Sequence, residues 1–285
     1  MAEIPDDPAV VHWFSKKIFD TLGIVYQEKN LYQLESRLRD ILSRNGFESF
    51  AALQAAVAGP DGVDLLAEVL DLATNNETMF FRDRDVFDGV RDMVLPAWQE
   101  STSSGPVFKV WCAACSTGQE PWSLAMLLAE FSEKNPEFRW NIQATDFSNR
   151  VLEKARSATY NKRELDRGMT GPELERFFTQ STAPATDSEC EWALKPEIRR
   201  LVSFHQENLM EQWDHPWQYN LIFCRNVLIY QNQENKAAIL KRLREQLLPG
   251  GFLVLGSAET IFLQDGSFEI QNFKDAAFYQ KRQAA

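Results

Sequence analysis

Residues 107–128, VFKVWCAACSTGQEPWSLAMLL, constrain the fold more than any other part of the chain. Their first residues are mostly apolar, as in a buried strand, and a run of small residues follows from Ala113 to Gly118. From Trp122 onward, apolar residues recur with helical spacing. A strand, a tight turn and a helix open a βαβ unit, in which small side chains let a ligand lie against the backbone. The stretch therefore predicts a cofactor site at the turn.

The residues around this turn limit the kind of cofactor. Neither G-x-G-x-x-G nor G-x-x-x-x-G-K-[ST] is present, which disfavours the two commonest phosphate-binding loops. Glu120, where the helix starts, would repel a pyrophosphate but not a cationic ligand. A second predicted strand, residues 140–147, ends in Asp146, where α/β folds of this kind place an acid that binds ribose hydroxyls. An adenosine that carries a positive group and no phosphates meets both conditions, and S-adenosylmethionine is such a molecule.

Length and composition exclude several classes of protein. The 285 residues suffice for two domains, and 44% hydrophobic with 25% charged residues is typical of a globular protein. No apolar run approaches about 18 residues, and residues 1–20 lack the apolar segment of a signal peptide. We therefore expect a cytoplasmic protein without membrane insertion, and a monomer by default. The net charge of −11 disfavours nucleic acid as a partner.

The cysteines do not predict a metal site. The four cysteines include one C-x-x-C pair, Cys112 and Cys115, and there is no second pair or histidine at ligand spacing. A zinc site is therefore disfavoured, and we expect no metal. A redox pair would need an exposed helix start, whereas Cys112 lies in the predicted strand. We interpret these residues as small buried thiols.

The chain is expected to form a helical domain over residues 1–75, a linker loop and helix over 76–105, and an α/β domain over 106–285. Four segments of the first domain carry apolar residues at helical spacing: 10–22, 31–44, 47–57 and 63–72. Arg37, Arg39 and Arg44 give the second segment a basic side. This side is either solvated or docks an acidic protein surface. A flexible joint is predicted at residues 101–106.

After residue 106 predicted strands and helices alternate, except in an insertion at about residues 160–200. The insertion is expected to form a small antiparallel subdomain, with a helix near 173–178, a polar loop over 179–189 and strands near Trp192 and Ile198. Beyond it we expect strands at 201–206, 219–224 and 252–256, a helix at 234–248 and a closing antiparallel pair at 268–272 and 277–281.

Polar or small residues follow four predicted strands and should converge, because ligands of open α/β sheets bind at the carboxyl ends of the strands. These residues are Ala114, Asp146, Asn208 with Leu209, and Arg225 with Asn226. A further segment, 74–84, combines Asn76, Thr78 and Arg82 with Phe80 and Phe81. It is either a loop over an apolar pocket or a linker whose phenylalanines pack on the core.

Several segments resemble the CheR-type chemotaxis protein methyltransferases, which esterify glutamate side chains of chemoreceptors. The resemblance covers nearly the whole chain, and its motifs are NETMFFRD (76–83), AACSTGQEPWSLA (113–125), ATDFSNRVLEKARSATY (144–160), ENLM (207–210) and FCRNVLIY (223–230). It implies a Rossmann-like class I methyltransferase sheet with an inserted antiparallel β subdomain, after an all-α N-terminal domain. It also implies S-adenosylmethionine as cofactor and the cytoplasmic methylation helices of chemoreceptors as partners. The arginines of the second helical segment and the insertion are the candidate docking surfaces for these helices.

Site residues follow from the same resemblance. It implies cofactor contacts from Asn76, Thr78, Arg82, Ala114, Glu120, Asp146, Asn208, Leu209, Arg225 and Asn226. Glu120 would face the methionine end, Asp146 the ribose and Asn208 the adenine. Arg82 and Tyr230 match positions near the transferred methyl group, so both are candidate catalytic residues. In some members the insertion grips a peptide at the receptor C-terminus, but here the loop is longer and less rich in glycine.

The reaction implied by the resemblance would need no general base, because a glutamate with a pKa of about 4.3 is ionised at neutral pH. Phe80, Phe81 and Trp122 could form an apolar wall that excludes water. An alternative function is a regulatory module that binds S-adenosylmethionine or S-adenosylhomocysteine without turnover. A nucleic-acid methyltransferase is disfavoured by the charge and by the lack of an N-P-P-Y-type loop.

Overall fold

The computed structural model describes residues 8–101, 106–180, 191–260 and 266–282. The chain forms two compact units. Unit 1 comprises residues 1–75 with 230–236, and unit 2 comprises 76–229 with 237–285. The expected linker and helix at 76–105 thus belong to unit 2, whereas the candidate residue Tyr230 belongs to unit 1. In the described ranges, no helix combines the length and apolar character needed to cross a bilayer.

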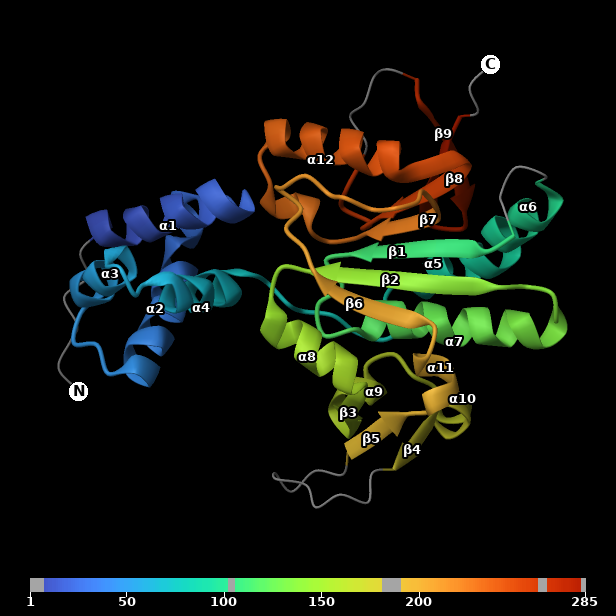
Figure 1. The fold of residues 1–285 in the computed structure, drawn as a ribbon, viewed down its shortest axis with the longest axis horizontal. Coiled ribbons are helices and arrows are strands. Elements are labelled where there is room, and N and C mark those ends of the chain that lie inside the picture. The colour runs from blue at the N-terminus through green and yellow to red at the C-terminus, as the bar shows by residue number, and fades with distance from the viewer. Residues whose placement is uncertain (1–7, 102–105, 181–190, 261–265, 283–285) are drawn as a thin grey trace. The chain divides into compact units, whose positions relative to one another are not determined.

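Unit 1 is helical (Figure 1), and its helices bury the apolar residues that recur at three- and four-residue spacing. Its four α-helices agree with the predicted segments. A short 3₁₀ helix, η1, precedes the second of them, and Ser49 caps the third by accepting a hydrogen bond from the Ala52 N–H. The elements are α1 (Pro8–Leu22), η1 (Glu28–Asn30), α2 (Leu31–Asn45), α3 (Phe50–Ala58) and α4 (Val63–Ala73).

The basic side of α2 is partly used inside unit 1. The Arg37 guanidinium donates hydrogen bonds to the Ala73 carbonyl at 2.6 Å and the Tyr26 hydroxyl at 2.8 Å. Arg39 lies over the Phe50 ring at 5.5 Å. Arg44 is exposed. Arg37 therefore stabilises the end of α4. This internal role could not be inferred from the positive charge of the residue alone.

Unit 2 is built on a seven-stranded sheet with the order β6-β2-β1-β7-β8-β10-β9. The first five strands of this order are parallel, and β10 runs antiparallel to both of its neighbours. The strand order reverses between β1 and β7, which makes this the expected binding edge. The strands are β1 (Phe108–Ala113), β2 (Trp140–Asp146), β6 (Val202–Gln206), β7 (Tyr219–Cys224), β8 (Leu247–Leu255), β9 (Phe268–Phe273) and β10 (Ala276–Lys281).

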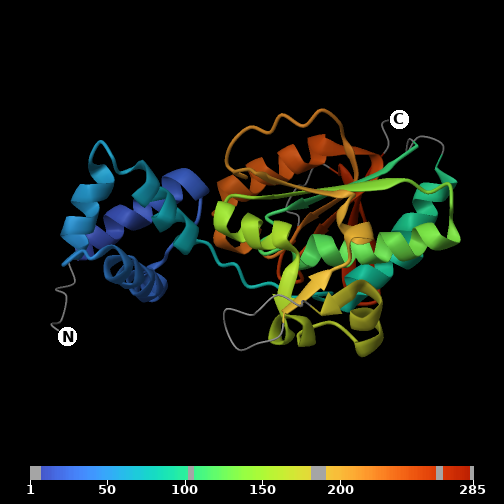
Figure 2. The same ribbon diagram turned by 60° about the horizontal axis from the view of Figure 1, so that its bottom comes forward.

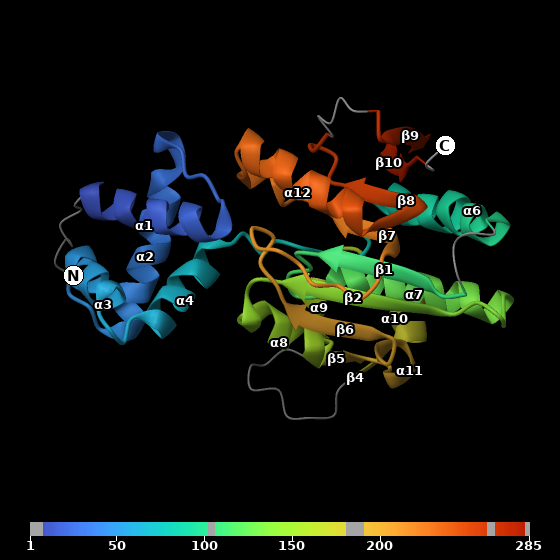
Figure 3. The ribbon, with the colours of Figure 1, turned by 45° about the horizontal axis from the view of Figure 1, so that its top comes forward.

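Helices bury both faces of this sheet, so its central strands are apolar on both sides. Alternate residues of β1 enter different clusters: Val110 and Cys112 pack in one, and Trp111 and Ala113 in the other. α12 (Gln233–Gln246) runs alongside β7 and β8 in Figure 3 and contributes to the second cluster. The first cluster contains α7 (Gln119–Lys134), and α8 (Asn149–Ser157) contributes to it.

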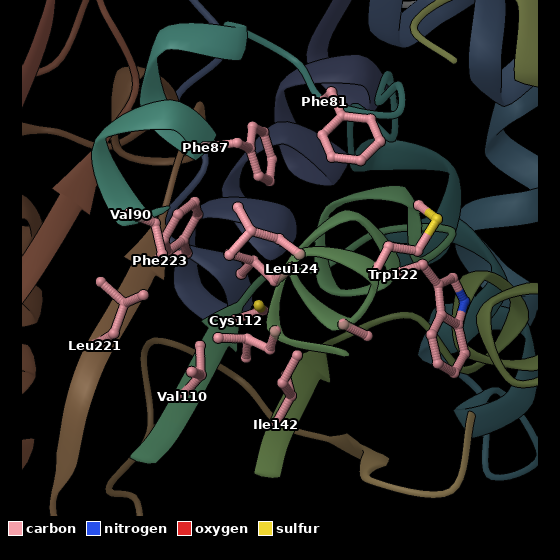
Figure 4. Packing of buried hydrophobic residues seen from close by; sticks show 14 of the residues in the cluster. Phe81, Phe87, Val90, Val110, Cys112, Trp122, Leu124, Ile142, Leu221 and Phe223 are labelled. Carbon is pink, nitrogen blue, oxygen red and sulfur yellow. The ribbon is translucent and has the colours of Figure 1, made fainter. Parts of the chain in front are cut away.

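The helix expected within residues 76–105 has an irregular centre. It consists of α5 (Arg84–Gly89), the π-helical segment η2 (Val90–Val94) and α6 (Leu95–Glu100). Figure 4 shows Phe87 and Val90 of this helix near Phe223 of β7, and the rings of Phe87 and Phe223 lie 6.1 Å apart. A Cβ atom on Gly89 would come within 2.5 Å of the Phe278 ring, so glycine allows the helix to approach the sheet. The predicted joint after it falls largely outside the described residues.

The insertion forms a three-stranded antiparallel sheet, β3-β5-β4, beside α7 and α8 (Figures 1 and 2). The strand expected near Ile198 is wrong: Ile198 lies in the short helix α11, which begins with Pro196 at a favoured first-turn position. Most of the predicted polar loop at 179–189 lies outside the described residues. The elements of the insertion are β3 (Thr159–Asn161), α9 (Lys162–Asp166), α10 (Gly171–Phe177), β4 (Phe178–Gln180), β5 (Glu191–Leu194) and α11 (Pro196–Arg199).

Burial should make three thiols unreactive. Cys112, Cys115 and Cys224 are free and at most 2% exposed, and burial raises the pKa of each thiol well above its usual value. Because the thiolate is the reactive form, we expect iodoacetamide at pH 8 to leave these residues unmodified in the folded protein and to modify them in denaturant. Peptide mapping by mass spectrometry measures each site separately. Rapid labelling of Cys112 in the folded state would contradict this packing.

Candidate active site

The turn between β1 and α7 has a backbone that few side chains allow. Ala114 and Ser116 adopt left-handed conformations, with φ of 59° and 51°, and Gly118 has φ of 93°. A Cβ atom on Gly118 would lie 2.8 Å from the Ala155 Cβ. The Tyr160 hydroxyl donates to the Thr117 carbonyl at 2.7 Å, so the first strand of the insertion supports the turn. Small residues are therefore needed here for backbone shape as well as for ligand approach.

Asp146 joins the first two strand ends. Its carboxylate accepts hydrogen bonds from the Ser116 N–H at 2.8 Å and the Ser148 N–H at 3.0 Å, and the residue is 7% exposed. These bonds hold the carboxylate at the end of β2, where the ribose contact is predicted. The Ser116 hydroxyl donates to the Asn76 carbonyl at 2.8 Å. Asp146, Ser116 and the start of the 76–83 segment are thus brought together.

Asn208 and Leu209 follow β6 in a loop that bonds to itself and to α12. The Asn208 side-chain oxygen accepts a hydrogen bond from the Met210 N–H at 2.9 Å. The Asn208 carbonyl accepts one from the Trp213 indole at 3.1 Å. Arg242 of α12 donates to the Leu209 carbonyl at 2.7 Å. These bonds set the path of the segment that is predicted to contact the adenine.

Arg225 is buried at the end of β7 and links three segments. Its side chain is 2% exposed. One guanidinium nitrogen lies 3.1 Å from the Glu120 carboxylate, and the other donates to Asp83 at 2.5 Å and to the Arg82 carbonyl at 3.0 Å. Its Nε is buried and has no hydrogen-bond partner among the residues that the structure describes. Arg225 thus carries a structural ion-pair network in addition to the predicted cofactor contact, which stays a prediction.

Glu120 is the acidic centre of this network. Burial raises its pKa, while the positive charges of Arg225 and Arg82 act in the opposite direction. Its side chain is 13% exposed, and Arg225 lies 3.1 Å from one of its carboxylate oxygens. Such a group can bind an ammonium or sulfonium ligand and disfavours phosphate.

Residues 76–83 form a loop that the core anchors. The Phe81 N–H donates to the Ser123 hydroxyl at 2.9 Å, and the Phe80 ring packs edge-on against Tyr160 at 5.0 Å. A Cβ atom on Gly168 would approach the Phe80 carbonyl to 1.9 Å. Thr78 and Arg82 are half-buried. Two buried aromatic residues that directly precede Arg82 thus anchor the loop in the core and fix the position of the Arg82 backbone.

The residues of the expected apolar wall are packed in the core. Phe80, Phe81 and Trp122 are at most 8% exposed and belong to the hydrophobic core. The Trp122 indole donates to the Ala155 carbonyl at 3.1 Å, and its ring contacts Phe204. These phenylalanines therefore pack on the core, as in the second interpretation of the segment, and the exclusion of water by these residues stays a prediction.

Tyr230 lies in unit 1, at the end of the 3₁₀ helix η3 (Leu228–Tyr230). Its hydroxyl accepts a hydrogen bond from the Asn75 side chain at 2.6 Å. Its carbonyl accepts one from the Val25 N–H at 2.9 Å. The hydroxyl therefore has a structural partner, and its catalytic role stays a prediction.

Glu259 is an important residue that sequence reasoning missed. It is 7% exposed and accepts hydrogen bonds from four backbone N–H groups, those of Asn226, Val227, Ile229 and Gly256. Asn226 is held at φ of 61°. Glu259 follows β8, the fifth parallel strand of the sheet. The candidate residues were taken from the ends of four strands, and adding the end of this strand would have included Glu259.

The donor set fits a nucleoside that is joined to an amino acid through a positively charged group. Asp146 ends β2, Glu120 lies in the first turn of α7 after β1, and Asn208 follows β6. The two carboxylates and the amide therefore lie at the carboxyl edge of the sheet. Among the described residues, no three His, Cys, Asp or Glu side chains are placed to hold a metal ion. This strand order and these residues define a Rossmann-like methyltransferase that uses S-adenosylmethionine.

Comparison with known proteins identifies the family. The sequence model described as "CheR methyltransferase, SAM binding domain" matches residues 76–277. Chemotaxis protein methyltransferase 1 of Pseudomonas aeruginosa is 36% identical over 85% of this chain and 86% of its own length. Chemotaxis protein methyltransferase 1 of Vibrio cholerae is 33% identical over 94% of each chain, and the Escherichia coli chemotaxis protein methyltransferase is 33% identical over 86% and 82%. The chain belongs to the CheR methyltransferase family.

Replacing Glu259 tests its role. In Glu259→Gln the new amide group would face backbone N–H donors, so two of them lose their acceptor. We expect the free energy of unfolding to fall by about 2 kcal/mol or more, since each buried unpaired donor is costly. Chemical denaturation measures this. Glu269→Gln, at an exposed position of β9, is the control for loss of one charge. Equal stability of the two variants would show that Glu259 does not hold the loop.

Proposed function

We propose that this protein transfers the methyl group of S-adenosylmethionine to glutamate side chains on the cytoplasmic helices of chemoreceptors. The observation that carries the proposal is that the family's motif residues meet around Arg225 and Asp146 at the carboxyl edge of the sheet. The names of the relatives support a chemotaxis substrate. The glutamate acceptor itself comes from the resemblance of the motifs.

The cofactor supplies a methyl group bonded to a positively charged sulfur. Asp146 would bind the ribose hydroxyls, Asn208 and Leu209 the adenine, and Glu120 the charged end. Asn76, Thr78, Ala114 and Asn226 are proposed to complete the site with backbone or amide contacts. Because protein hydrogen bonds already hold Asp146, Asn208 and Glu120, these parts of the proposed site are preorganised before the ligand enters.

Arg82 is proposed to orient the acceptor carboxylate. It is half-buried, its guanidinium donates a hydrogen bond to the Glu77 carbonyl at 3.3 Å, and its own carbonyl accepts one from Arg225. A guanidinium can hold a carboxylate through two parallel hydrogen bonds. Catalysis would then come from alignment of the carboxylate oxygen with the methyl group, with Tyr230 as a second directing group.

Removing the Arg82 side chain should separate catalysis from folding. In Arg82→Ala we expect kcat for methylation of receptor cytoplasmic fragments to fall about a hundredfold, which is typical of lost alignment. The free energy of unfolding should stay within about 1 kcal/mol, because the guanidinium makes few protein contacts. Release of base-labile methanol measures the ester. Arg282→Ala, at an exposed position, is the control. Normal ester formation by Arg82→Ala would refute the assignment.

The pH profile tests the absence of a general base. A free glutamate titrates at about 4.3, so we expect log(kcat/KM) to be flat between about pH 6 and 9. A slope of one through this range would instead indicate that a protein group must lose a proton.

If the protein binds S-adenosylhomocysteine but forms no ester on any receptor fragment, the alternative function as a silent regulatory module is correct.

A further inference from the structure

Unit 2 contains a pocket lined by arginines on the side of β6. Its volume is about 360 Å³, and it lies between α8, α11 and β6. Arg156, Arg199 and Arg200 contribute its positive charge, and we name it the arginine pocket. The remaining lining is apolar and consists of Trp122, Pro196, Val202 and Phe204.

The three arginines have donor capacity to spare. Arg156 donates one hydrogen bond to the Phe204 carbonyl at 3.0 Å, and Arg199 donates one to the Arg156 carbonyl at 2.9 Å. In the described parts of the chain, no carboxylate pairs with any of the three, whereas Arg84, Arg176 and Arg225 all have acidic partners. A guanidinium carries five N–H donors, so most donors in the pocket are available to a ligand.

The charge of the pocket opposes that of the whole protein. The chain carries a net charge of −11, yet this pocket gathers three positive side chains. Like charges repel, so the cluster is favourable mainly when an anion binds. The overall charge would repel a nucleic acid, and the apolar lining suits a peptide that presents carboxylates beside apolar side chains.

The pocket also shares two elements with the candidate active site. Trp122 stands two residues after Glu120 at the start of α7, and β6 leads directly to Asn208. β6 is an edge strand that pairs only with β2. A protein segment bound here would therefore lie along the same helix and strand that carry cofactor-binding residues.

We propose that the arginine pocket binds an acidic segment of the protein substrate that flanks the methylated glutamate. This inference rests on the proposed function. It places a surface for substrate recognition in unit 2. This surface is additional to the docking surface predicted on the basic side of α2 in unit 1.

The test compares the full chain with the variant Arg199→Ala/Arg200→Ala. Binding of a receptor cytoplasmic fragment is measured by calorimetry in the presence of S-adenosylhomocysteine, and methylation of the same fragment is measured separately. We expect the Kd and KM for the fragment to rise about tenfold, with kcat and the Kd of S-adenosylhomocysteine unchanged. Higher salt should weaken binding by the unaltered protein more than by the variant.

Matched variants separate charge from folding. Lys241→Ala/Arg282→Ala removes two exposed positive charges elsewhere and should leave the Kd for the fragment unchanged. Arg200→Glu alone should weaken binding without disturbing the bond that Arg199 makes to α8. Arg200→Lys keeps the charge and should retain most of the affinity.

The outcomes distinguish this proposal from the proposed function. If the unaltered protein methylates the fragment and the double variant binds it equally well, the pocket proposal is wrong and the function stands. If the unaltered protein binds the fragment without methylating it, the proposed function fails, and the binding of the variants still decides the role of the pocket. If the unaltered protein neither binds nor methylates the fragment, both are wrong.

Discussion

The site depends on one buried guanidinium. Arg225 emerges from β7 beside the point where the strand order reverses, and it bonds to the Glu120 carboxylate at the start of α7, to the Arg82 carbonyl and to the Asp83 carboxylate. A buried cation needs close acidic partners, because desolvation would otherwise destabilise it. Glu120 and Asp83 meet this need. The ion-pair network therefore determines where the proposed cofactor residue Glu120 and the proposed catalytic residue Arg82 stand.

A second constraint is backbone geometry at the strand ends. Ala114, Ser116 and Asn226 adopt left-handed conformations that cost energy unless neighbouring groups fix them. Asp146 holds the first turn through Ser116, and Glu259 holds the last one through Asn226. Buried carboxylates thus act on both sides of the switch point as acceptors for backbone N–H groups. This explains how an acidic chain places loops accurately at a sheet edge.

The sequence predicted most of the fold because hydrophobic periodicity determines long elements. Residues 219–224 and the pairing of β9 with β10 were correct, and the helices of unit 1 differed only at their ends. The strand near Ile198 failed because a four-residue segment carries too little periodicity and tertiary contacts decide its form. The candidate site residues were found from strand ends and motifs. Glu259 and the internal bonds of Arg37 and Arg225 were missed because partners far apart in sequence create them.

The central claim is that Arg225 assembles the site, and hydrogen–deuterium exchange of Arg225→Lys tests it most directly. Lysine keeps the positive charge but replaces the planar guanidinium, which has several N–H donors, with a single ammonium group. It therefore cannot bond to Glu120, Asp83 and the Arg82 carbonyl together. The account predicts faster exchange of backbone amides at residues 80–84 and 119–123, with the strands of the sheet unchanged. Exchange identical to that of the unaltered protein in these segments would contradict it.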